Sequence, residues 1–131
     1  MNCLRKHLRR YPLALACIAL IWYLCLFKPP RTRLSDIENF DKVVHVLMYF
    51  GTCTVIWWEY LRSHVRLSRR RTVLWAVVCP ILMSGLIELA QAYLTTTRSG
   101  DWRDFAANSI GVGLAALFSL TVLHRLIHPK P

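Results

Sequence analysis

The segment RSGDWRDFAANSIGVG, residues 98–113, joins a dense cluster of charges to a hydrophobic run. Two Arg and two Asp lie within its first seven residues, and Asn108, Gly111 and Gly113 lie in the first turns of the run that follows. That run, residues 105–127, is long enough to cross the roughly 30 Å hydrocarbon core of a membrane as a helix. The segment therefore predicts the charged rim of a membrane-embedded helix that carries Asn and Gly inward.

Three more hydrophobic blocks of similar length precede this run, at residues 11–27, 43–61 and 72–94. The chain has 131 residues, of which 55% are hydrophobic, yet its formal net charge is +10, so apolar and basic residues are separated into blocks. This pattern predicts an all-α, polytopic membrane protein. We expect a small bundle of four transmembrane helices over residues 11–127, after a basic N-terminus at 1–10 and before a short tail at 128–131.

The distribution of Lys and Arg predicts the orientation of this bundle, because basic residues in short loops are retained on the cytoplasmic side. Eleven lie in the N-terminus, the second connection and the tail: Arg5, Lys6, Arg9, Arg10, Arg62, Arg66, Arg69, Arg70, Arg71, Arg125 and Lys130. Six lie on the opposite side: Lys28, Arg31, Arg33, Lys42, Arg98 and Arg103. We expect a multi-pass protein of the inner (cytoplasmic) membrane with both termini cytoplasmic. No small-residue cleavage site follows Phe27, so the first helix is expected to be an uncleaved signal anchor.

The positive charge indicates membrane topology rather than nucleic-acid binding. Because the basic residues flank hydrophobic blocks instead of forming a soluble face, the expected partner is the lipid bilayer with its anionic headgroups, and no nucleic acid is expected. Four of the five Cys lie inside the hydrophobic blocks without metal-ligand spacing. Free thiols, no cofactor and no metal site are therefore predicted.

Polar side chains inside the last three blocks form stripes at helical spacing. An ionisable side chain in the middle of a spanning helix costs roughly 3 kcal/mol, so such residues are rare without a reason. The stripes are Asp41, His45, Tyr49 and Thr52 with Lys42 beside them; Ser84, Glu88, Gln91 and Thr95; and Asp104, Asn108, Gly111 and Ala115. Alternating topology brings all three to the outer leaflet. They predict one polar pocket there with the first helix peripheral to it, whereas Glu59, at the inner end, is expected to form an ion pair near Arg62 and Arg66.

Three segments carry recognisable motifs in a fixed order: FDKVVHVLMYFG at 40–51, ELAQAY at 88–93 and RSGDWRDFAANSIGVG at 98–113. They resemble the successive signatures of the VanZ-like family of small bacterial membrane proteins, over about residues 34–127. The founding member of that family is associated with low-level resistance to the glycopeptide teicoplanin, but no settled reaction belongs to the family. The motif positions that the resemblance carries over are Asp41, Lys42, His45, Glu88, Gln91, Arg98, Asp101, Asp104 and Asn108.

The polar residues suggest a membrane-embedded site for a cell-envelope or lipid-linked molecule, and whether it is catalytic stays open. The candidates for acid or base catalysis are His45, Glu88 and Asp104. Lys42 and Arg98 are candidate clamps for a phosphate or carboxylate. The full candidate binding set is Asp41, Lys42, His45, Tyr49, Glu88, Gln91, Arg98, Asp101, Asp104 and Asn108. Two alternatives remain: a non-enzymatic envelope protein that binds or shields surface components, and a structural cluster that only fastens the helices.

Overall fold

The computed structural model describes residues 2–27, 33–37, 39–63, 66, 68–96 and 100–131. The regular structure of these residues is helical, without a strand, which confirms the all-α prediction. The elements are α1 (Asn2–Arg10), α2 (Pro12–Leu26), the 3₁₀ turn η1 (Arg33–Asp36), α3 (Phe40–Ser63), α4 (Arg69–Val73), the π-helical turn η2 (Leu74–Val78), α5 (Cys79–Leu94), α6 (Trp102–Phe118), the π-helical turn η3 (Ser119–Leu123) and α7 (His124–Ile127).

Two sets of these elements form continuous helices. The elements α4, η2 and α5 run together through Arg70–Leu94, and α6, η3 and α7 run together through Trp102–Ile127. Pro80 lies two residues after the end of the π-helical turn in the first of these helices. A proline has no N–H to donate and its ring crowds the preceding turn, so a wider turn accommodates it without ending the helix.

Length and composition make these two long helices candidate membrane spans. The helices α1 and α2 meet the same criterion only as a pair, and they are bent by 85° at the break between them. The helix α3 has 24 residues, about 36 Å, but polar side chains such as His45 and Glu59 lower its mean hydropathy, and it is not among the candidates. Of the four predicted spans, two thus meet the criterion on their own within the described residues.

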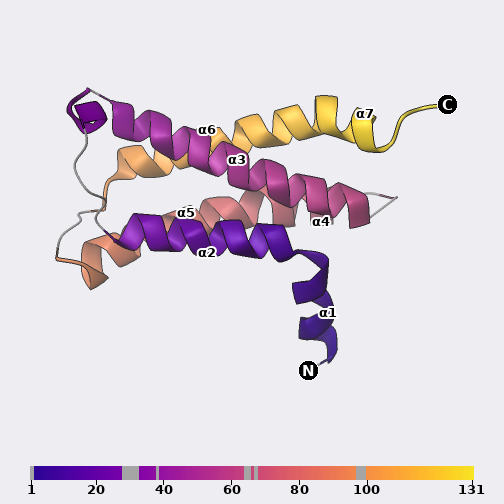
Figure 1. Ribbon diagram of the computed structural model, residues 1–131, viewed down its shortest axis with the longest axis horizontal. Coiled ribbons are helices and arrows are strands. Elements are labelled where there is room, and N and C mark those ends of the chain that lie inside the picture. The colour runs from indigo at the N-terminus through magenta and orange to yellow at the C-terminus, as the bar shows by residue number, and fades with distance from the viewer. Residues whose placement is uncertain (1, 28–32, 38, 64–65, 67, 97–99) are drawn as a thin grey trace.

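The helices α2, α3, α5 and α6 share a hydrophobic core. Figure 1 shows α3 crossing α6 on one side of the molecule and α2 lying alongside α5 on the other. The core residues come from all four helices: Ile21, Cys25, Tyr49, Cys53, Ile87, Val112 and Ala115. The helices α6 and α3 approach closely at Gly111, where a Cβ would lie 2.6 Å from the backbone oxygen of Val46. Only glycine fits there, which is the small-residue packing of membrane helix pairs.

The molecule has two chemically different ends. The polar end holds Asp41, Lys42, His45, Asp101 and Asp104, where α3 and α6 begin and α5 finishes. The basic end holds Arg10, Arg62, Arg71 and Arg125 on α1, α3, α4 and α7. Both chain termini lie at the basic end in Figure 1. This places them at the same end as the connection before α4, as the predicted orientation requires.

The expected ion pair of Glu59 with Arg62 or Arg66 is wrong. The Glu59 side chain is buried, and its two carboxylate oxygens accept hydrogen bonds from the backbone N–H groups of Leu13 (3.0 Å) and Ala14 (2.9 Å). These N–H groups belong to the first turn of α2, where they have no partner within the helix. Glu59 therefore caps α2 from a neighbouring helix, while the Arg62 guanidinium lies over the Trp58 ring at 4.8 Å.

Candidate functional site

The local structure at the start of α6 positions two residues of the polar end. Asp101 is the N-cap of α6, and its side chain accepts a hydrogen bond from the backbone N–H of Arg103 at 2.9 Å. This cap fixes where the helix begins. Because Asp104 and Asn108 are four residues apart, both then lie on the same face of α6, and both are buried.

Lys42 joins the carboxylates of the polar end. Its ammonium donates to Asp101 at 3.1 Å and to Asp104, and it lies 3.8 Å from Asp41. Asp104 is buried, Asp101 is partly exposed and Asp41 is exposed. One ammonium thus serves three carboxylates, and the cluster is rich in acid. Since Lys42 is neutralised by its own chain, the geometry disfavours the predicted role of this residue as a phosphate clamp.

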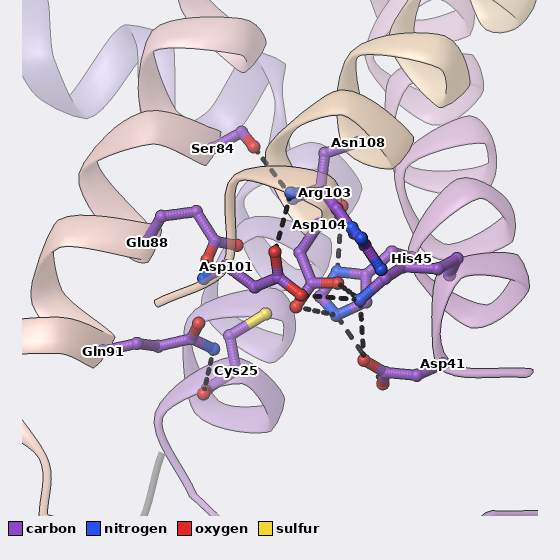
Figure 2. Close-up of polar contacts among 11 residues, drawn as sticks. Cys25, Asp41, His45, Ser84, Glu88, Gln91, Asp101, Arg103, Asp104 and Asn108 are labelled. Carbon is purple, nitrogen blue, oxygen red and sulfur yellow. Dashed lines mark hydrogen bonds and ion pairs between the residues drawn. The ribbon is translucent and has the colours of Figure 1, made fainter. Parts of the chain in front are cut away.

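His45 connects this charged cluster to the interior of the bundle. Its Nδ1 donates to the Asn108 side-chain oxygen at 2.9 Å, and the Asn108 amide nitrogen donates to Ser84 Oγ at 2.8 Å. Figure 2 shows this chain crossing from α3 through α6 to α5. With its proton on Nδ1, the ring presents Nε2 to Asp104 at 3.6 Å and to Asp41 at 3.8 Å. An imidazole between an amide oxygen and two carboxylates is placed to exchange a proton with a carboxylate or with a bound ligand.

Glu88 and Gln91 extend the polar end along α5. Both side chains are buried. Glu88 Oε2 accepts from the backbone N–H of Asp101 at 2.9 Å, and Gln91 Nε2 donates to the backbone oxygen of Cys25 at 2.6 Å. The second carboxylate oxygen of Glu88, Oε1, and the amide oxygen of Gln91, Oε1, have no hydrogen-bond partner among the described residues. The first helix was predicted to be peripheral to the site, and this prediction is wrong. The backbone oxygen of Cys25 in α2 accepts the hydrogen bond that positions the Gln91 side chain.

The pKa of the Asp101 carboxyl lies below its ordinary value. The main cause is the hydrogen bond from the Arg103 backbone N–H, followed by the hydrogen bond from the Lys42 ammonium. Both donors stabilise the ionised carboxylate. Asp101 is therefore held in its charged form at the exposed rim of the cluster.

Most of the predicted site residues lie together in the structure. Asp41, Lys42, His45, Asp101, Asp104 and Asn108 form one connected group, and Glu88 reaches it through the Asp101 backbone. Tyr49 lies deeper, in the hydrophobic core. Arg98 lies outside the described residues. Sequence reasoning placed Ser84 on the α5 stripe but left it out of the site, and it missed the Cys25 carbonyl because a backbone acceptor has no signature in the sequence.

The ligand atoms of Asp41, His45 and Asp104 all lie within 4.8 Å of one another, a spacing at which a divalent cation fits. The Lys42 ammonium already supplies positive charge to two carboxylates of this cluster. The sequence-based expectation of no metal stays a prediction.

Comparison with known proteins identifies the family. Neither the curated proteins nor the solved structures contain a match to this chain. The family model described as VanZ/LLP1 matches residues 9–124, nearly the whole chain, and this range contains every residue of the polar cluster. The chain therefore belongs to the VanZ/LLP1 family.

Proposed function

We propose that the chain is a four-span protein of the inner membrane, with both termini cytoplasmic, whose polar end binds or acts on a cell-envelope or lipid-linked molecule from the outer leaflet. The observation that carries the proposal is the pair of buried, unpartnered oxygens on Glu88 and Gln91 beside the acid-rich cluster. A buried acceptor without a hydrogen bond costs about 1–3 kcal/mol. A ligand that donates hydrogen bonds to these oxygens removes that cost.

The charge of the cluster indicates which chemical groups the ligand presents. Asp41, Asp101 and Asp104 outnumber the one ammonium of Lys42. A phosphate brought to this place would meet repulsion, whereas an amine or hydroxyl would find acceptors. We therefore assign to the ligand a hydrogen-bond-donating group, with His45 as the residue that exchanges a proton if a reaction takes place.

The alternative function is structural, and one observation favours it. The contacts of Lys42 join α3 to α6, and the chain from His45 through Asn108 to Ser84 joins α3, α6 and α5. A cluster that pairs with itself can serve to hold helices together. Hydrogen bonds between membrane helices contribute only about 0.6 kcal/mol on average, so this number of buried polar groups exceeds what packing requires.

Two substitutions separate the site from the structural cluster. In His45→Ala the ring that faces Asp41 and Asp104 is lost, and in Glu88→Gln the charge is lost while an oxygen remains to accept from Asp101. If the polar end is a site, both variants lose the envelope phenotype that deletion of the gene reveals, such as altered teicoplanin susceptibility, and the thermal unfolding of the purified proteins changes little. The control is His124→Ala at the basic end, which keeps both properties. A loss of phenotype that follows a matching loss of stability would establish the structural function instead.

The proposed topology has its own test. In a variant without native cysteines, single Cys replacements at Asn39, Ser68 and Thr96 are treated with a membrane-impermeant thiol reagent in intact cells. All three native residues are exposed. We expect labelling at 39 and 96 and none at 68, because the basic connection remains cytoplasmic. Labelling at 68 alone would invert the proposed orientation, and labelling at only one of 39 and 96 would contradict the four-span arrangement.

A further inference from the structure

A groove of about 580 Å³ lies at the basic end of the molecule. Residues of α1, α2, α3, α4, η2 and α5 line it. Its volume falls within the roughly 300–1,000 Å³ that small-molecule sites occupy. None of the residues that form the polar cluster contributes to it, so it needs an explanation of its own.

The lining of the groove changes from basic to apolar along the helix axis. His7 and Arg10 of α1 and Arg71 of α4 lie at the ends of the helices. Leu15 and Ile18 of α2 and Trp75 of η2 lie further along the same groove. Arg10 and Arg71 are exposed, and the ion pairs of the described residues include neither of them. The groove thus offers free guanidinium groups beside an apolar channel.

The helix α1 gives this end the form of a membrane interface. Four of its nine residues are Lys or Arg, and every one of the nine is exposed. The helix is bent away from α2 by 85°. Figure 1 shows it leaving the direction of the bundle at the end of α2. A short, strongly amphipathic basic helix in this arrangement lies in the headgroup layer of a bilayer. The Glu59 carboxylate caps the first turn of α2, directly after this bend.

We propose that this groove binds one acidic phospholipid of the surrounding membrane. The phosphate lies between Arg10 and Arg71, and an acyl chain lies against Leu15, Ile18 and Trp75. Charge complementarity selects this occupant, because the free cations stand where a headgroup lies and the apolar wall runs where a lipid tail lies. The proposal is independent of any ligand at the polar end and of which leaflet faces the cytoplasm.

The test uses the position of Trp75, which lines the groove. The purified protein in neutral detergent is titrated with phosphatidylglycerol or phosphatidylcholine whose acyl chains carry bromine, a quencher of tryptophan fluorescence. Because the chain has five Trp, the quenching of Trp75 is isolated by comparison with Trp75→Phe. The signal of interest is the part of the quenching that this variant lacks. We expect phosphatidylglycerol to quench it at lower concentration. A basic residue at a lipid surface contributes roughly fivefold in affinity for an anionic lipid. The double variant Arg10→Gln with Arg71→Gln should therefore bind phosphatidylglycerol roughly 30-fold more weakly and bind phosphatidylcholine with unchanged affinity.

Two further variants distinguish a groove from general surface attraction. Arg5→Gln with Arg125→Gln removes the same charge from the same end without touching the groove, and it retains the preference for phosphatidylglycerol. Cys79→Phe fills the groove while keeping both Arg, and it loses the quenching. The proposal is overturned if both lipids quench equally, if the Arg5 and Arg125 variant loses the preference as well, or if Cys79→Phe keeps it. It is also overturned if Trp75 lies in a dimer interface and is quenched only after the dimer dissociates.

Discussion

The charged side chains are paired with one another at the polar end of the molecule and unpaired in the groove at the basic end. At the polar end the charges face one another: Lys42 contacts three carboxylates, and His45 lies between two of them. At the basic end the cations Arg10 and Arg71 face a groove and meet no acid among the described residues. Charges paired within the chain fix the positions of helices, whereas unpaired charges at a membrane surface are available to lipid.

The difference also separates a closed region from an open one. Near the polar end α3 and α6 approach so closely that Gly111 has no room for a Cβ. At the basic end α2 and α5 leave a groove, and the buried Glu59 holds the first turn of α2 by its backbone. One end therefore combines a close helix contact with paired charges. The other combines the packing of Trp57, Leu61 and Ala76 with a buried carboxylate that caps α2. Substitutions at each end measure how much each arrangement contributes.

The largest effect is expected from Gly111→Ala. The added Cβ would lie 2.6 Å from the Val46 backbone oxygen and 3.0 Å from the Tyr49 Cβ, so α6 must move away from α3. Because the nearest atom is backbone and cannot turn aside, we expect the free energy of unfolding to fall by about 3 kcal/mol, the upper part of the range for overpacking. Reversible unfolding of the purified protein in detergent and denaturant measures it.

The matched control is Gly113→Ala on the same helix. A Cβ there meets nothing within 4 Å, and alanine favours the helix over glycine by about 1 kcal/mol. We expect Gly113→Ala to be neutral or stabilising. If both variants lose the same stability, the close contact of α3 with α6 does not hold the polar end together.

The second prediction concerns Glu59→Ala at the basic end. Removing the carboxylate leaves the N–H groups of Leu13 and Ala14 without their acceptor, and the Ala14 bond is buried. Hydrogen bonds to charged groups contribute about 1.5–3 kcal/mol each, and water replaces part of the loss at the less buried Leu13, so we expect a loss of about 2 kcal/mol. Glu59→Gln keeps one oxygen acceptor and should lose about half as much in the same unfolding measurement. Equal stability of all three proteins would show that the cap contributes nothing and that the bend of α1 has another cause.

Helical class and the convergence of the polar residues could be predicted from the sequence because both follow from periodicity. The spacing of Asp41 to His45, and of Asp104 to Asn108, is one helical turn, so a shared face follows once the helices are assigned. The burial of Glu88, Asn108 and His45 agrees with that interpretation.

Contacts made by the backbone could not be predicted in the same way. Every residue carries the same N–H and C=O groups, so nothing in the sequence singled out Cys25 as the acceptor for Gln91 or the first turn of α2 as the partner of Glu59. The closeness of Arg62 in the sequence predicted an ion pair with Glu59. In the structure, two backbone N–H groups at the start of α2 donate hydrogen bonds to the Glu59 carboxylate instead. The groove at the basic end depends on the bend between α1 and α2, which hydropathy does not record.

The smallest expected effect is the contribution of Asp101 to stability in acid. Its pKa is lowered by the Arg103 N–H and by Lys42, so the folded state binds a proton at Asp101 less readily than the unfolded state does. A depressed carboxyl pKa adds stability that is complete above the ordinary value of 3.8 and is lost as the pH falls through the lower folded value. We therefore expect the melting temperature of the native protein to exceed that of Asp101→Asn slightly at pH 6, and the two values to converge below pH 4. Asparagine retains an N-cap oxygen for Arg103 but loses the charge that Lys42 contacts, so the variant isolates the ionic part. Asp36→Asn, which removes one exposed carboxylate away from Lys42, serves as the control. A difference between Asp101→Asn and the native protein that persists unchanged into acid would mean that the cap geometry, and not the charge facing Lys42, is what Asp101 contributes to the polar end.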